Sequence, residues 1–171
     1  MRTLVALACS LALVGVLAGA AGAADEPDTG NLSVERGKGV VMLELRGSLL
    51  GRLANGTLTV TDLTPRDRYT AIVTARKITS VRPVGRTVRY RGQGMRFRML
   101  GGRYRVVVRG SGIALSAVGK GLVVLDAERL SPLEDAGVYS LEAGVDCSLD
   151  PGVCTPLPEE PERYSIPAET S

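Results

Sequence analysis

The 171-residue sequence contains no histidine and no tryptophan, and it contains a single phenylalanine. Without histidine, the chain lacks the commonest general base and the commonest metal ligand of proteins. Without tryptophan, it lacks the largest aromatic stacking surface, which disfavours a sugar-binding module. We therefore expect no bound metal and no cofactor.

Catalytic motifs are also missing from the sequence. None of its serines lies in a G-x-S-x-G motif, and it has no P-loop, dinucleotide-binding fingerprint or EF-hand loop. The acidic residues of the central region are few, and no spacing pairs them as the two carboxylates of a glycosidase. We predict that the protein is not an enzyme and has no catalytic residue. A hydrolase that works without histidine is the remaining enzymatic alternative.

The first 24 residues have the layout of an export signal. Arg2 is followed by an uncharged apolar run and then by small residues. This order is typical of a secretory signal peptide, and we predict a signal over residues 1–23, cleaved after Ala23 or Ala24. The alternative is a retained anchor, because residues 3–24 are nearly long enough to span a bilayer. After cleavage we expect no transmembrane span and an extracytoplasmic protein, secreted or held in the cell envelope.

Two cysteines, Cys147 and Cys154, remain after the predicted signal. In an exported protein, an isolated pair this close in sequence predicts a disulfide bond. The loop that it closes is short, so the expected stabilisation is about 2–3 kcal/mol. A metal site would need further histidine or cysteine ligands, which the sequence does not provide.

Apolar and polar residues alternate with a period of two over most of residues 40–125. Glycine-containing segments interrupt this alternation at intervals of about 8–12 residues, as turns between short strands would. No segment has the length, the caps and the 3.6-residue period of a helix. The pattern predicts an all-β fold, an antiparallel β-sandwich or small barrel of about 8–10 short strands. The expected turns are Asn55-Gly56, 92–94, Gly101-Gly102, 110–112 and 119–121.

The length that remains after the signal suits one domain. We predict an all-β domain over residues 38–155 that includes the disulfide-closed loop. Residues 24–37 are acidic and polar, which predicts a flexible leader. Residues 156–171 contain four prolines and four glutamates, which predicts a disordered tail. Within this tail, residues 164–166 are apolar enough to dock as a short edge strand.

Two parts of the predicted domain resemble each other. The sequence Arg-Gly-Ser at 46–48 recurs at 109–111, an offset of 63 residues, and the pattern of 58–62 recurs at 122–126, an offset of 64. An internal duplication of a strand–turn–strand unit would produce this similarity. The alternative is that any two β-hairpins interrupted by glycine look alike.

The net charge of +3 conceals a strong segregation of charge along the chain. Residues 36–120 carry a net charge of +15, whereas residues 121–171 carry −9. Strand parity turns Val88 and Tyr90 inward and places the neighbouring arginines on the outside. We expect three neighbouring strands to display arginines on the same side of one sheet. The candidate binding residues are Arg89, Arg91, Arg96, Arg98, Arg103, Arg105 and Arg109.

Like charges on adjacent strands destabilise a sheet, so this clustering calls for an explanation. The first is an anionic partner, an envelope polymer or lipid headgroups, because the planar guanidinium group binds phosphate and carboxylate bidentately. Nucleic acid is disfavoured, because Tyr90, Phe97 and Tyr104 share the apolar parity and are not available to stack on bases. The second explanation is that the chain's own acidic segment, residues 126–162, covers the basic face. The third is composition alone, since 18 arginines against 3 lysines are expected of a coding sequence with high G+C content.

A resemblance to known proteins is carried by three segments: DLTPRD at 62–67, GGRYRVVVRGSGI at 101–113, and the late cysteine pair. These segments resemble uncharacterised small secreted β-domain proteins of high-G+C Gram-positive bacteria. The resemblance covers most of residues 40–156 and implies a small exported β domain, but it implies no active site. We therefore predict a secreted, non-enzymatic β domain that acts as a binding protein or as a cell-envelope component.

Overall fold

The computed structural model describes residues 29–67, 69–128 and 135–167. Within these ranges the protein is built from antiparallel β-strands, and a single short 3-10 turn is its only helical segment, so the predicted all-β class is confirmed. No helix in the described ranges is long and apolar enough to cross a membrane. The predicted signal peptide, residues 1–23, lies outside these ranges. The elements are β1 (Gly30–Asp62), β2 (Ile72–Val84), β3 (Thr87–Ala127), β4 (Val138–Ser140), η1 (Pro151–Val153), β5 (Thr155–Pro156) and β6 (Glu162–Ile166).

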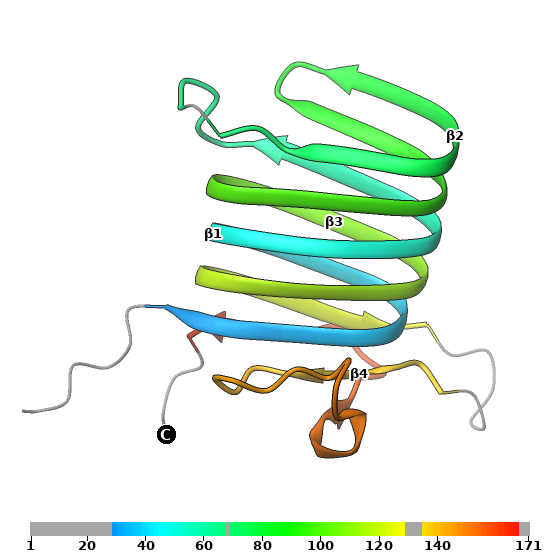
Figure 1. Ribbon diagram of the computed structural model, residues 1–171, viewed down its shortest axis with the longest axis vertical. Helices are drawn as coiled ribbons and strands as arrows, with labels where there is room; N and C mark the ends of the chain where they lie inside the picture. Colours follow the sequence, from blue (N-terminus) through cyan, green and yellow to red (C-terminus); the bar gives the residue numbers. More distant parts are fainter. Residues whose placement is uncertain (1–28, 68, 129–134, 168–171) are drawn as a thin grey trace, which may run out of the picture.

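The two longest strands, β1 and β3, wind around each other (Figure 1). Val41 of β1 pairs with Val108 on one side and with Leu125 on the other. Val108 in turn lies between Val41 and Leu58. The two strands therefore form an antiparallel coil in which one complete turn takes 17 residues, from Val41 to Leu58 or from Val108 to Leu125.

The coil is flattened into two layers that face each other, as in a sandwich (Figure 1). Each long strand crosses one layer, bends at the edge and returns through the other layer. At one end of the coil, β2 pairs with β3 in both layers and so adds one strand segment to each. The front layer contains β1 residues 31–35 and 48–53, β3 residues 95–99 and 113–117, and β2 residues 72–75. The back layer contains β1 residues 40–46 and 57–61, β3 residues 87–91, 103–109 and 122–126, and β2 residues 80–84.

Glycines allow the long strands to bend at the edges between the layers. Gly56 pairs with both Gly92 and Gly110, so three glycines meet at one edge. A Cβ atom added to Gly110 would lie 2.0 Å from the carbonyl oxygen of Asn55, closer than two such atoms can approach. The predicted turns at Asn55-Gly56, 92–94, 101–102, 110–112 and 119–121 are therefore bends within continuous strands. For this reason the described residues form six strands, two of them very long, in place of 8–10 short ones.

The core fills the space between the two layers and consists of the inward-facing side chain of every second residue. Leu43, Leu58 and Val108 of the back layer and Met95 and Ile113 of the front layer are completely buried. The predicted inward parity of the aromatic residues is confirmed, because Phe97 and Tyr104 are buried and Tyr90 packs against the core, partly buried.

One end of the coil is closed by the C-terminal elements. β4 pairs with residues 33–35 of β1, and β6 pairs with residues 121–125 of β3. The predicted flexible leader is wrong for residues 30–37, because these belong to β1 and Leu32 is completely buried. The predicted disordered tail is wrong for residues 157–166, because Leu157 and Ile166 are buried, and the short edge strand expected at 164–166 is part of β6. Residues 24–28 and 168–171 lie outside the described ranges.

The disulfide between Cys147 and Cys154 is present as predicted, and its loop is fixed to the first turn of the coil. The Cys147 side chain is completely buried, and its backbone N–H donates a hydrogen bond of 2.9 Å to Ser33 Oγ. Because Ser33 lies at the start of β1 in the front layer, the loop rises beside the outer face of that layer.

The glycines repeat along both long strands with nearly the same spacing. One series lies at 30, 39, 47 and 56 in β1 and at 92, 101, 110 and 119 in β3, while further glycines at 37, 51, 94, 102, 112 and 121 fall outside this series. A flattened coil needs a bend every half-turn, so two strands of one coil acquire the same spacing whether or not they arose by duplication. The predicted internal duplication stays a prediction.

Candidate functional site

All seven arginines singled out from the sequence are exposed, as strand parity predicted. The expectation that they share one side of one sheet is wrong, because the chain bends between them at Gly92 and again at Gly101. Five of them lie on the outer face of the back layer, whereas Arg96 and Arg98 lie on the outer face of the front layer. The back-layer arginines are Arg89, Arg91, Arg103, Arg105 and Arg109. The structure thus offers two distinct basic surfaces.

The back-layer surface, here called the basic track, consists of Arg89, Arg91 and Arg109 together with Thr57 and Thr59, which lie beside these arginines. Thr57 lies between Arg91 and Arg109, and Thr59 lies beside Arg89. Arg89 also directly faces Arg82 of β2. Among the described residues, no carboxylate lies within ion-pair distance of Arg89, Arg91 or Arg109. In the part of the chain that the structure describes, these three guanidinium groups are thus not engaged in ion pairs.

Glu44 forms ion pairs with two arginines at the other end of the back layer. Its carboxylate oxygens lie 2.6 Å from Arg103 Nη2 and 2.7 Å from Arg105 Nη2. Hydrogen bonds from Arg105 and Arg103 hold the pKa of Glu44 below its ordinary value, although burial acts in the opposite direction. Arg103 directly faces Arg46 across the strands, so Glu44 reduces a repulsion within the sheet. Two of the five back-layer arginines, Arg103 and Arg105, therefore already have a carboxylate partner within the protein.

The front layer carries a groove of about 590 Å³ on its outer face. The groove crosses the strands from the disulfide-closed loop to β2, and its two ends differ in chemistry. Its outward-facing lining side chains are Ser33, Glu35, Leu50, Arg52, Ile72, Thr74, Arg96, Arg98, Ala114, Ser116, Asp146 and Ser148, of which Ser33 and Ala114 are buried.

The end of the groove near β2 is basic and apolar. Arg98 lies between Leu50 and Ile72, which are its direct partners on the two neighbouring strands. Leu50 is 52% exposed and Ile72 is 44% exposed, so apolar surface flanks the guanidinium group on both sides. No carboxylate among the described residues lies within ion-pair distance of Arg96 or Arg98.

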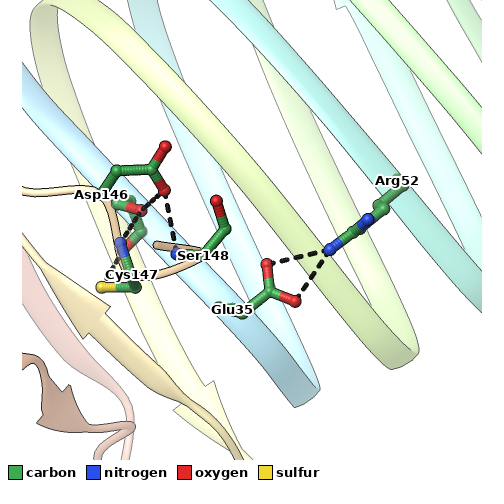
Figure 2. Close-up of polar contacts among 6 residues, drawn as sticks. Glu35, Arg52, Asp146, Cys147 and Ser148 are labelled. Atoms are coloured by element: carbon green, nitrogen blue, oxygen red, sulfur yellow. Dashed lines mark hydrogen bonds and ion pairs between the residues drawn. The ribbon is translucent and has the colours of Figure 1, made fainter. Parts of the chain in front are cut away.

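The end of the groove near the loop is acidic and rich in hydroxyl groups. The carboxylate of Glu35 accepts hydrogen bonds of 2.9 and 3.2 Å from Arg52 Nη2 (Figure 2). Asp146 Oδ1 accepts the backbone N–H of Ser148 at 2.9 Å, and Ser33 Oγ lies 3.5 Å from it. The hydrogen bond from the Ser148 backbone is the main reason why the pKa of Asp146 is lowered, so this carboxylate is ionised at neutral pH.

Among the described residues, the acidic C-terminal segment forms no ion pair with the candidate arginines. β6 extends the edge of the back layer beside residues 121–125, rather than crossing its outer face. Among the described residues, the ion pairs formed by the seven arginines run to Glu44 within β1. In the described ranges, no three acidic or cysteine side chains gather as metal ligands.

Sequence reasoning missed the groove and the two threonines. Residues 48–52 show the same alternation as the other strands, and this parity places Leu50 and Arg52 outward together. Their proximity to Arg96 and Arg98 depends on which turns of the coil are neighbours, which the local pattern does not indicate. Comparison with known proteins gave no matching family model, no matching curated protein and no matching solved structure.

Proposed function

We propose that the protein is an exported, non-enzymatic β domain of the cell envelope whose basic track binds an anionic polymer. The observation that carries this proposal is the set of Arg89, Arg91 and Arg109, which are exposed and have no carboxylate partner among the described residues. A guanidinium group binds phosphate or carboxylate through two parallel hydrogen bonds, and the hydroxyl group of Thr57 between two arginines adds a further donor.

The energetics of the sheet support an external partner. Arg82 and Arg89 face each other directly on neighbouring strands. Like charges in this position are destabilising, by roughly 0.2–1 kcal/mol for a pair of cross-strand neighbours. No described carboxylate compensates this pair, in contrast to Arg103 and Arg105 beside Glu44. A bound polyanion would supply the missing compensation.

Export of the protein is supported by two features. A disulfide bond persists in oxidising compartments, which is where a signal peptide over residues 1–23 would direct the chain. The expected result for the exported protein is an N-terminus at Ala24 or Asp25, determined by N-terminal sequencing of protein recovered outside the cytoplasm. An N-terminus at Met1 in that fraction would show that the segment is retained as an anchor.

The binding proposal is tested with inorganic polyphosphate as the probe. We expect the parent protein to bind polyphosphate with an affinity that falls steeply as salt is raised. The variant Arg89→Gln/Arg91→Gln/Arg109→Gln should lower the affinity by about tenfold or more and reduce the salt slope by about 2–3. The matched control Arg76→Gln/Arg96→Gln/Arg98→Gln removes the same charge away from the basic track, because Arg76 directly follows the front-layer residues 72–75 of β2. This control should retain most of the affinity.

Two outcomes would overturn this proposal. Equal losses in the two triple variants would show that net charge alone, rather than the basic track, attracts the polymer. Absence of binding in the parent, with binding restored by Glu159→Gln/Glu160→Gln/Glu162→Gln, would favour the alternative that the protein is structural and that its acidic C-terminal segment masks the basic face.

A further inference from the structure

We propose that the groove of the front layer binds an amphiphile with a single anionic head and an apolar chain, such as a fatty acid. This inference concerns the opposite face of the molecule from the basic track and does not depend on the polymer proposal. It follows from the uneven chemistry of the groove, which is basic and apolar near β2 and acidic near the disulfide-closed loop.

The head group is recognised by Arg96 and Arg98. The two residues lie on the same strand, two positions apart, so both side chains project into the groove from the same face. Arg52 is the direct cross-strand partner of Arg96, but Glu35 occupies its guanidinium group. The free positive charge of the groove is therefore concentrated on Arg96 and Arg98, whose planar groups suit a carboxylate, sulfate or phosphate.

The apolar chain is accommodated by side chains next to this cationic pair. Leu50 and Ile72 flank Arg98 directly, and Leu100 and Val118 extend the exposed apolar surface beyond the groove on the same face. Leu100 and Val118 are 53% and 47% exposed, and Ser48 is their common cross-strand partner. Neighbouring apolar side chains that remain half exposed in a folded domain mark a surface that gains by being covered.

The acidic end of the groove restricts the number of anionic groups in the ligand. Asp146 is ionised at neutral pH, and Glu35 lies on the same wall as part of an ion pair. A polymer with an anionic group on every unit would place one of them beside Asp146, where like charges repel. A single-headed amphiphile avoids this repulsion, because only its head carries charge. The groove of about 590 Å³ lies within the usual size range of small-molecule sites.

The test uses sodium decanoate below its micelle concentration as the probe, with binding measured by calorimetry. We expect saturable binding of decanoate, no binding of acetate and weaker binding of decanol, because both the head and the chain are required. The variant Arg96→Gln/Arg98→Gln should weaken decanoate binding by about tenfold. The variant Leu50→Ser/Ile72→Ser should weaken it by about fivefold or more through loss of apolar contact.

The matched control is Arg89→Gln/Arg91→Gln, which removes the same charge from the back layer and should leave decanoate binding unchanged. Equal effects of the two arginine double variants would overturn the proposal, as would binding of anionic phospholipid vesicles without binding of monomeric decanoate. Circular dichroism of each variant shows whether the fold is retained. Because polyphosphate binding depends on the back layer and decanoate binding on the front layer, failure of one proposal is distinguishable from failure of the other.

Discussion

Gly56 and Gly110 are direct cross-strand partners at one edge of the coil, and each occupies the space that a side chain of the other would need. A Cβ atom on Gly56 would lie 2.1 Å from the carbonyl oxygen of Arg109, and one on Gly110 would lie 2.0 Å from that of Asn55. The obstacle is backbone in both cases, so a rotamer change cannot relieve it. The coil can therefore bend at this edge only while both residues lack a side chain.

We expect the substitution Gly110→Ala to destabilise the protein by about 3 kcal/mol, because the backbone of β1 must shift to admit the methyl group. The measurement is the free energy of unfolding in urea. The matched control is Gly85→Ala in the β2–β3 turn, where no atom lies within 4 Å of the added Cβ and φ is +59°. There the cost should be about 1 kcal/mol, the penalty for a left-handed residue alone. Equal costs at the two positions would contradict the steric explanation of the bend.

Ser33 holds the disulfide-closed loop against the first turn of the coil. Its Oγ accepts the buried backbone N–H of Cys147 at 2.9 Å. We expect Ser33→Ala to lower the free energy of unfolding by about 1–3 kcal/mol, because this N–H is left without a partner. The control is Ser116→Ala, an exposed residue of the same groove and the cross-strand neighbour of Ser33, which should change stability by less than about 0.5 kcal/mol. A similar small effect at Ser33 would show that the hydrogen bond does not anchor the loop.

Glu44 gives the protein a pH-dependent contribution to stability. Its pKa is lowered in the folded state from an ordinary value of 4.5, because Arg105 and Arg103 bind its ionised form. A lowered folded-state pKa stabilises the protein above the unfolded-state pKa, and this stabilisation is lost as the pH falls through the folded-state value. We expect Glu44→Gln to be less stable than the parent at pH 7, with the difference shrinking as the pH falls below 4.5. Urea unfolding at pH 7 and at pH 3 measures both differences, and a pH-independent difference would contradict this role.

The period-two pattern of the sequence was sufficient to predict the all-β class and the facing of individual side chains. Leu43, Val106 and Phe97 are buried where their parity placed them, and the arginines between and around the inward residues are exposed. This success has a simple physical basis, since alternation is a property of each strand by itself. The same parity could have placed Leu50 and Arg52 on an outer face together.

The winding of the strands could not be predicted in this way. A glycine within an alternating pattern is compatible with a tight turn or with a bend, and the difference is decided by residues far away in sequence, such as Gly110 opposite Gly56. Because the bends were interpreted as turns, the sequence did not indicate that Arg96 and Arg98 lie on a different layer from the other five arginines. For the same reason the groove beside Arg96 and Arg98 was not predicted. The ends were missed for a different reason: residues 30–37 and 157–166 are polar on average, but Leu32 and Ile166 are each buried against the coil.

We expect Arg89 to lower the stability of the folded protein while it contributes to polyphosphate binding. Arg89 faces Arg82 across the β2–β3 pair, whereas Arg91 faces Ser80, although both arginines belong to the same surface. We expect Arg89→Thr to raise the free energy of unfolding by about 0.5 kcal/mol at low salt, because it removes a repulsion between like charges and introduces a residue that favours strands. Arg91→Thr is the matched control, and it should bring no comparable gain in stability. The gain at position 89 should shrink in high salt, which screens the repulsion.

Both variants should weaken polyphosphate binding. A gain in stability without a loss of affinity in Arg89→Thr would mean that Arg89 lies outside the binding surface, whereas a loss of both would mean that Arg82 and Arg89 do not repel each other in the folded protein.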